Sequence, residues 1–173
     1  MALATFSRTT AVRAIPRHEV EDQWVPAAPF RAHVSHLVTT AQIPWPVVAH
    51  KAGVSLGTLR TLLYGRNGRV RPKISIIAAR SLIELRMEDL RWMRGAQMSA
   101  EKAGMRIRRL RSLGITWEKI AHYLTVDVCA CQELARGERT SCSVMVDVLS
   151  QCACSEAGLP SWQDFTDGED LLS

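Results

Sequence analysis

Apolar residues recur along this chain at helical spacing, and no segment shows sustained alternation of apolar and polar residues. The stretch PFRAHVSHLVTTA illustrates the pattern, because its apolar residues fall on one side of a helix. These residues are Phe30, Val34, Leu37, Val38 and Ala41. The helical spacing predicts an all-α fold, and the missing alternation predicts no strand.

Helix-breaking and capping residues divide the following segment into three further helices. The prolines of PWPVVAHKA open the second helix, because a helix accepts proline only in its first turn, and Gly53 ends it. Ser55 caps a third helix, which runs to Tyr64 and stops at Gly65. The fourth helix is ISIIAARSLIEL. Together the four helices form one small unit.

The chain also repeats itself. The identical pairs are Ile43 with Ile115, Trp45 with Trp117, Ala49 with Ala121, His50 with His122, Val54 with Val126, Leu62 with Leu134 and Gly65 with Gly137. They predict two tandem four-helix units, at residues 26–90 and 98–156, joined by a linker at 91–97. Residues 1–25 are expected to form a flexible N-terminal arm, with a transit peptide as the alternative, and residues 157–173 an acidic tail.

Charge is distributed unevenly between the two units. The chain has 22 Lys and Arg against 17 Asp and Glu, a net charge of +5. No acidic residue occurs from Arg31 to Arg80, whereas acids are concentrated in residues 116–173. A basic block without acids favours contact with a polyanion, because phosphates approach it without repulsion. A solvated basic surface is the alternative interpretation.

The spacing around Gly53 is similar to that of the helix-turn-helix of DNA-binding regulators. A small residue, Ala49, lets two helices approach closely, and Gly53 can adopt the positive φ of the turn. Val54, Leu59 and Leu62 would fill the wedge between the helices. The same spacing occurs in ordinary helical bundles, so it favours DNA binding only together with the acid-free charge pattern.

In that geometry the third helix is the recognition helix and enters the major groove. The residues expected to contact bases are Ser55, Leu56, Gly57, Thr58, Arg60, Thr61 and Tyr64. Arg60 is the best candidate for a bidentate contact with guanine. The hydroxyls of this helix can bond phosphate oxygens instead, and Leu56 is equally compatible with core packing.

Cationic side chains on and beyond this helix are expected to bind DNA phosphates. They are Lys51, Arg66, Arg69, Arg71, Lys73, Arg106, Arg108 and Arg109. The loop GRNGRVRPK combines an Asn-Gly turn signal with a proline that keeps Arg71 extended, which predicts a short wing-like loop. It would follow the DNA backbone or enter a minor groove; a solvated loop is the alternative.

The second unit keeps the apolar skeleton but loses the cationic surface. Asp127 and Glu133 stand where the first unit has a serine and a threonine, and Thr125 replaces Gly53, so the turn is expected to differ. Asp127 still suits a helix cap, but both acids would repel phosphates. We therefore expect residues 98–156 to pack, to form a homodimer or to bind a protein partner. Two DNA readers on one extended site are the alternative.

All cysteines lie in the second unit, at Cys129, Cys131, Cys142, Cys152 and Cys154. The motif CAC occurs twice, which invites a zinc or redox interpretation. Residues two apart on a helix point away from each other, however, and Cys131 replaces a core leucine. We therefore expect core or incidental thiols, no metal and no cofactor. Nothing in the spacing groups a nucleophile with a base, so no enzyme activity is expected.

The segments VPAAPFRAHVSHL and GVSLGTLRTLLYGRNGRVRPKI, followed by a weaker second unit, resemble the tandem helix-turn-helix proteins of actinobacteria and their phages. The resemblance covers residues 26–90 well and 98–156 loosely, and it implies a DNA-binding regulator. Thr125 and the cysteine-rich second unit depart from the pattern.

We expect a repressor-like, sequence-specific regulator that binds double-stranded DNA, in the cytoplasm and associated with the nucleoid. No apolar run is long enough to predict a membrane span. The alternative is an interaction module that docks a partner or the transcription machinery through its acidic second unit, with DNA contact incidental. An RNA binder would need an aromatic stacking platform on a sheet, for which the sequence gives no sign.

Overall fold

The computed structural model describes residues 23–159, so most of the predicted arm and tail lies outside the described residues. The first unit contains β1 (Trp24–Pro26), α2 (Ala28–Ala41), α3 (Trp45–Lys51), α4 (Leu56–Tyr64), β2 (Lys73–Ser75) and α5 (Ile76–Ile83). After α6 (Met87–Gly95), the second unit contains β3 (Gln97–Ser99), α7 (Glu101–Ser112), α8 (Trp117–Leu124), α9 (Val128–Arg136), β4 (Ser141–Ser143) and α10 (Val144–Glu156). The two units therefore repeat one order of elements.

The predicted boundaries of the first three helices are confirmed, but the fourth, predicted as ISIIAARSLIEL, is shorter: Ile74 and Ser75 belong to β2, and α5 ends at Ile83. Gln42 ends α2 in the left-handed region, with φ of 52°, and Pro46 lies in the first turn of α3. Ser55 caps α4, its Oγ accepting a hydrogen bond of 3.2 Å from the Thr58 amide. Gly65 follows the last residue of α4.

The prediction of no strand was wrong. The part of the chain that the structure describes contains two small antiparallel sheets, β1 with β2 and β3 with β4. Each strand has three residues, which is too short for an alternating pattern to be recognised. The buried central residues are Ile74 in β2 and Cys142 in β4, paired with Val25 and Met98. Each sheet ties the segment before the first helix of a unit to the segment before its last helix.

The residues predicted to fill the wedge between the second and third helices are buried. Ala49, Leu59 and Leu62 have no exposed surface, and Val54 retains 9%. In the second unit, Ala121, Cys131 and Leu134 occupy the corresponding buried positions. Cys131 therefore acts as a small apolar core residue, as expected.

The prediction that the turn of the second unit differs was wrong. Gly53 has a φ of 64° and Thr125 a φ of 56°, so both residues lie in the left-handed region. A β-branched residue is disfavoured there by about 1–2 kcal/mol, because its Cβ approaches the following carbonyl. The packing around the turn thus imposes one backbone conformation on both units.

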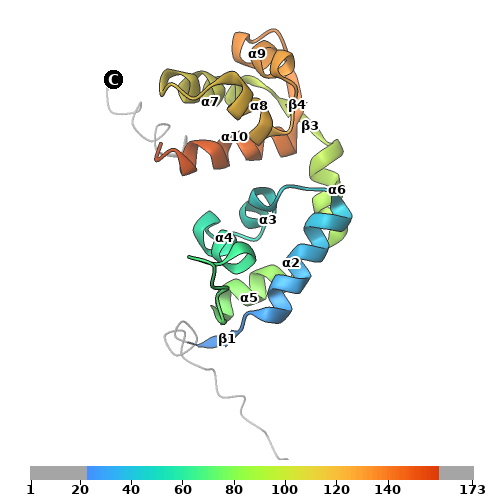
Figure 1. Ribbon diagram of the computed structural model, residues 1–173. Coiled ribbons are helices and arrows are strands. Elements are labelled where there is room, and N and C mark those ends of the chain that lie inside the picture. The colour runs from blue at the N-terminus through green and yellow to red at the C-terminus, as the bar shows by residue number, and fades with distance from the viewer. Residues whose placement is uncertain (1–22, 160–173) are drawn as a thin grey trace, which may run out of the picture.

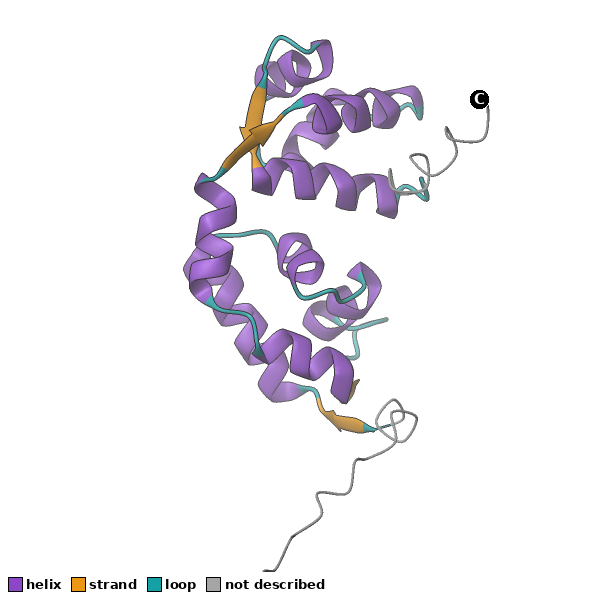
Figure 2. Cartoon of the chain, turned by 180° about the vertical axis from the view of Figure 1, so that it is seen from behind, coloured by secondary structure: helices purple, strands orange, loops and turns teal. Residues whose placement is uncertain are grey.

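The two units are joined through α6, and α10 of the second unit faces α3 and α4 of the first (Figure 1). Figure 1 shows α10 opposite α3 and α4, and the reverse view in Figure 2 shows α6 running along the joining edge. Residues 91–97, predicted as a linker, form the end of α6 and enter β3. Leu90 and Met93 on α6 are buried. Among residues 23–159, no helix combines the length and apolar character needed to cross a bilayer.

Candidate functional site

Helix α4 divides into a buried side and an exposed side. Leu59 and Leu62 face the core, while Gly57, Arg60 and Tyr64 are exposed. The hydroxyls of α4 bond locally: Ser55 donates to Thr58 Oγ1 at 2.8 Å, and the Thr61 hydroxyl donates to the Gly57 carbonyl at 2.7 Å. These bonds fix the rotamers of the side chains predicted to face DNA.

Arg60 does not project freely from α4. Its Nη2 lies 2.8 Å from Oε1 of Glu156, at the end of α10 in the second unit. The guanidinium carbon also lies 5.6 Å from the centroid of the Trp45 ring. The Arg60 side chain is nevertheless 59% exposed and that of Glu156 24% exposed, so solvent reaches the ion pair. Such a pair is weak and can exchange for another anion.

Leu56 packs against the core and lines a cavity between the two units. Its half-buried position fits the packing interpretation better than contact with a base.

The loop after α4 forms a small hairpin tip, as the Asn-Gly signal predicted. The amide of Arg66 donates to the Arg69 carbonyl at 2.9 Å, and the amide of Arg69 donates back at 3.1 Å. Asn67 and Gly68 have φ of 52° and 74°, the signs that a type I′ turn requires. A side chain at Gly65 would overlap the Arg69 carbonyl, so the hairpin folds closely over the end of α4. Arg66 and Arg69 are therefore exposed at a defined turn.

The base of this hairpin is anchored. Arg71 lies over the Trp24 ring, with its guanidinium carbon 5.2 Å from the centroid, and its carbonyl accepts a 2.9 Å hydrogen bond from Arg31. Lys51 and Lys73 are exposed. We call the exposed side of α4, together with Arg66 and Arg69, the reader surface, after the DNA contact predicted for it from the sequence.

The arginines of α7 do not form a free basic strip. Arg106 lies 2.7 Å from Asp147, and both side chains are only 11% exposed. Moving Arg106 to a DNA phosphate would leave the Asp147 carboxylate buried without a partner, so the phosphate prediction does not fit this placement. Arg108 donates to the Ala135 carbonyl at 2.6 Å, and Arg109 lines the cavity between the units.

The surface of α9 is neutralised by its own ion pairs. Asp127 caps the helix by accepting a 2.7 Å hydrogen bond from the Ala130 amide. Glu133 pairs with Arg139 at 2.6 Å, and Arg136 with Glu138 at 2.7 Å. This surface differs sharply in charge from the reader surface.

The cysteines are free thiols, and Cys129 alone among them is exposed. Burial raises the pKa of Cys131 to about 11 and that of Cys152 to about 12, so both stay protonated and unreactive at neutral pH. Within residues 23–159, no group of three or more His, Cys, Asp or Glu side chains is placed to hold a metal ion.

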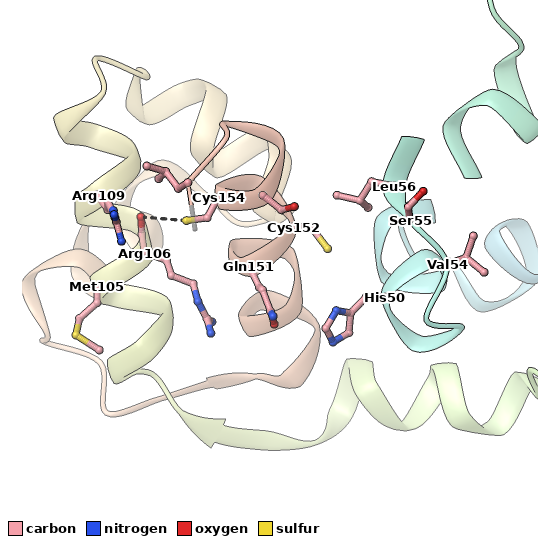
Figure 3. Close-up of a pocket in the computed structure, with 12 residues that line it drawn as sticks. His50, Val54, Ser55, Leu56, Met105, Arg106, Arg109, Gln151, Cys152 and Cys154 are labelled. Carbon is pink, nitrogen blue, oxygen red and sulfur yellow. Dashed lines mark hydrogen bonds between the residues drawn. The ribbon is translucent and has the colours of Figure 1, made fainter. Parts of the chain in front are cut away.

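Sequence reasoning missed a cavity of about 300 Å³ between the two units. We call it the inter-unit cavity. In Figure 3, α10 lies between α7 and α4, and these helices and His50 of α3 supply most of the lining. Burial is the main cause that lowers the pKa of His50. No short motif could have revealed the site, because its walls come from segments far apart in the chain.

Comparison with protein-family models, with curated proteins and with solved structures finds no match to this chain.

Proposed function

We propose that this protein is a sequence-specific, double-stranded DNA-binding regulator of transcription, with α3 and α4 acting as a helix-turn-helix. The main support is the reader surface, which exposes Arg60, Arg66 and Arg69 within a stretch that has no acidic residue from Arg31 to Arg80. Phosphates can approach such a surface without repulsion from its own unit. The buried wedge and the left-handed turn at Gly53 add geometric support.

Glu156 has a defined place in this proposal. Its carboxylate holds Arg60 by a charge-assisted hydrogen bond of the kind that a DNA acceptor would make. DNA must therefore displace Glu156 from Arg60 before Arg60 reads a base. The exposure of the pair makes this exchange inexpensive, and Arg66 and Arg69 can engage phosphates first.

For the second unit we propose a packing and regulatory role rather than equal DNA reading. Its α9 surface is already paired, and α10 contacts the first unit, where the Cys152 thiol lies 3.7 Å from the Pro46 carbonyl. Docking of a partner protein remains the second candidate, favoured by the acidic composition of residues 116–173.

Selection of bound sequences from random duplex DNA tests the proposed function. We expect the full chain to enrich one motif, and Arg60→Ala to reduce the ratio of affinities for that motif and for random DNA by about tenfold. Equal weakening on both DNAs would show that Arg60 does not read bases. If the chain binds a protein from the same cells more tightly than it binds DNA, and that binding survives high salt, the interaction module would be favoured.

A further inference from the structure

The guanidinium of Arg60 is held on two sides. Its Nη2, on the edge of the group, donates a hydrogen bond of 2.8 Å to the Glu156 carboxylate. Its face lies over the ring of Trp45, with the guanidinium carbon 5.6 Å from the ring centroid. The two contacts use different parts of the group, so displacement of the carboxylate leaves the contact with the ring in place.

The Trp45 ring is itself held by its neighbours. Trp45 is the first residue of α3, is half-buried and packs against the hydrophobic core. The ring of Tyr64, one turn after Arg60 on α4, meets it edge-to-face with 6.4 Å between the centroids. A ring that is packed in this way provides a fixed surface for the guanidinium.

The orientation of the Arg60 guanidinium decides which acceptors it can bind. An arginine recognises guanine by donating two hydrogen bonds from one edge of its planar group to O6 and N7. Both bonds form only when the plane of the group is correctly oriented, and a mobile side chain loses conformational entropy when it is fixed. A ring that restrains the guanidinium before DNA arrives reduces that loss.

The second unit provides a contrast. Trp117 aligns with Trp45 in the repeat and also lies against an arginine, at 4.7 Å. That arginine is Arg111 of α7, whose guanidinium also donates to a backbone carbonyl of its own unit. The place of Arg60 in the repeat is taken by Gln132. Trp117 therefore holds an arginine against its own unit, whereas Trp45 holds one on the reader surface.

We propose that Trp45 is a positioning residue for DNA reading: it restrains the Arg60 guanidinium so that both hydrogen bonds to guanine form once Glu156 has been displaced. This inference rests on the proposed function and adds to it a residue that acts through Arg60. Trp45 governs discrimination between bases and not the attraction of phosphates, which Arg66 and Arg69 supply.

Nitrogen-15 relaxation of the arginine side chains tests the restraint on the full chain without DNA. Glu156→Gln is present in every sample, so that no carboxylate holds Arg60. The heteronuclear NOE of Arg60 Nε should fall in Trp45→Leu, which has no aromatic face, and should be largely retained in Trp45→Phe. Trp117→Leu is the matched control and should lower the value for Arg111 alone. An Arg60 value that Trp45→Leu leaves unchanged would overturn the proposal.

Modified DNA tests the reading itself. The probes are the duplex that the full chain selects from random DNA and the same duplex with one motif guanine at a time replaced by 7-deazaguanine, which lacks N7. At the position that Arg60 reads, the unmodified duplex should bind about tenfold more tightly. Trp45→Leu should reduce this ratio about twofold to fivefold and change affinity for random DNA less than about twofold. An equal loss on every duplex would indicate a structural role only and overturn the proposal.

Arg60→Ala is the background that separates positioning from folding. Because Trp45 acts through Arg60, adding Trp45→Leu to Arg60→Ala should change the ratio no further, whereas a second, additive loss would contradict the proposal. Circular dichroism checks that each variant is folded; if Trp45→Leu is not, Trp45→Met fills more of the space without an aromatic face and replaces it.

The outcomes for the proposed function and for this inference can be told apart. If the chain binds no DNA, the proposed function fails and the guanine assignment fails with it, while the relaxation measurement still decides whether Trp45 restrains Arg60. If the chain reads its motif and Trp45→Leu leaves the ratio unchanged, the proposed function stands and the positioning role is wrong.

Discussion

Helices α4 and α9 hold the same place in the two units and present opposite surfaces. Both begin with a side-chain cap, Ser55 or Asp127, and both end at a glycine. The exposed charges of α4 and its hairpin tip are cationic, and Arg60 alone pairs with a glutamate, from the second unit, whereas around α9 each arginine pairs with a neighbouring glutamate. The buried skeleton is therefore compatible with either surface, and the exposed residues alone decide which unit can face a polyanion.

The connection that follows these helices differs as well. Residues 65–72 join α4 to β2 and include the hairpin tip, whereas the shorter segment 137–140 joins α9 to β4. The tip carries Arg66 and Arg69 beyond the helical skeleton. The extra residues are thus an addition to the surface and not a requirement of the fold.

The largest effect is expected from neutralising this tip. Arg66→Gln with Arg69→Gln should weaken binding to all DNA sequences roughly 50-fold at about 0.1 M salt, because each lost phosphate contact removes about 0.9 from the salt slope. The slope of log K against log salt should become shallower by about 1.8. Fluorescence anisotropy over a salt series measures both quantities.

The matching change in the second unit is Arg136→Gln with Arg139→Gln. Both arginines are already paired with glutamates, so DNA affinity should change less than about threefold. Equal losses from the two double variants would abolish the contrast between the units, and two DNA readers on one extended site would then be the better interpretation.

The sequence alone predicts the features that depend on a few neighbouring residues, such as helix caps and turns. Ser55, Gly53 and the Asn-Gly turn act over a few neighbouring residues, so the caps and turns around α4 could be predicted. The repeat correctly placed Cys131 in the core. Three-residue strands carry no usable periodicity, and they form because the sheets connect segments distant in the chain.

The pairing of charges could not be predicted in the same way. Arg60 meets Glu156 and Arg106 meets Asp147 only after the units and helices have packed. Composition therefore identified a cationic first unit, but it gave no sign that Arg60 and Arg106 are paired with carboxylates. The inter-unit cavity was missed for the same reason, since its two arginines share no motif with Val54 and Leu56.

The second-largest effect concerns the packing of α7 against α9. A Cβ at Gly104 would overlap the backbone carbonyl of Leu134, so the two helices approach more closely than an alanine allows. Gly104→Ala should lower the free energy of unfolding by about 2 kcal/mol, as overpacking exceeds the gain in helix propensity. Urea denaturation measures the change.

Gly95→Ala is the control for this substitution. Gly95 ends α6 with nothing near the added Cβ, so alanine should be neutral or stabilising by up to about 1 kcal/mol. A neutral Gly104→Ala would mean that α7 and α9 can separate at little cost, and the second unit would then be less rigidly packed than proposed.

The two turns provide a smaller test. Thr125→Gly should raise the free energy of unfolding by about 1 kcal/mol, because glycine removes the left-handed strain of a β-branched residue. The reciprocal change, Gly53→Thr, should lower it by a similar amount. Thermal unfolding checks both. Loss of stability from Thr125→Gly would contradict the inference that packing imposes one turn on both units.

The smallest effect is expected at the ion pair that joins the units. Glu156→Gln should raise DNA affinity by about twofold to fivefold, because DNA no longer competes with a carboxylate for Arg60 and an exposed pair is worth about 0.2–1 kcal/mol. Glu138→Gln is the matched control: it makes the same charge change at an exposed pair in the second unit, with Arg136. An equal gain from both variants would show that the increase in DNA affinity comes only from the change in net charge. A gain from Glu156→Gln alone, lost again when Arg60→Ala is added, would assign it to release of the reader surface, because only then does the acid act through the arginine that it holds.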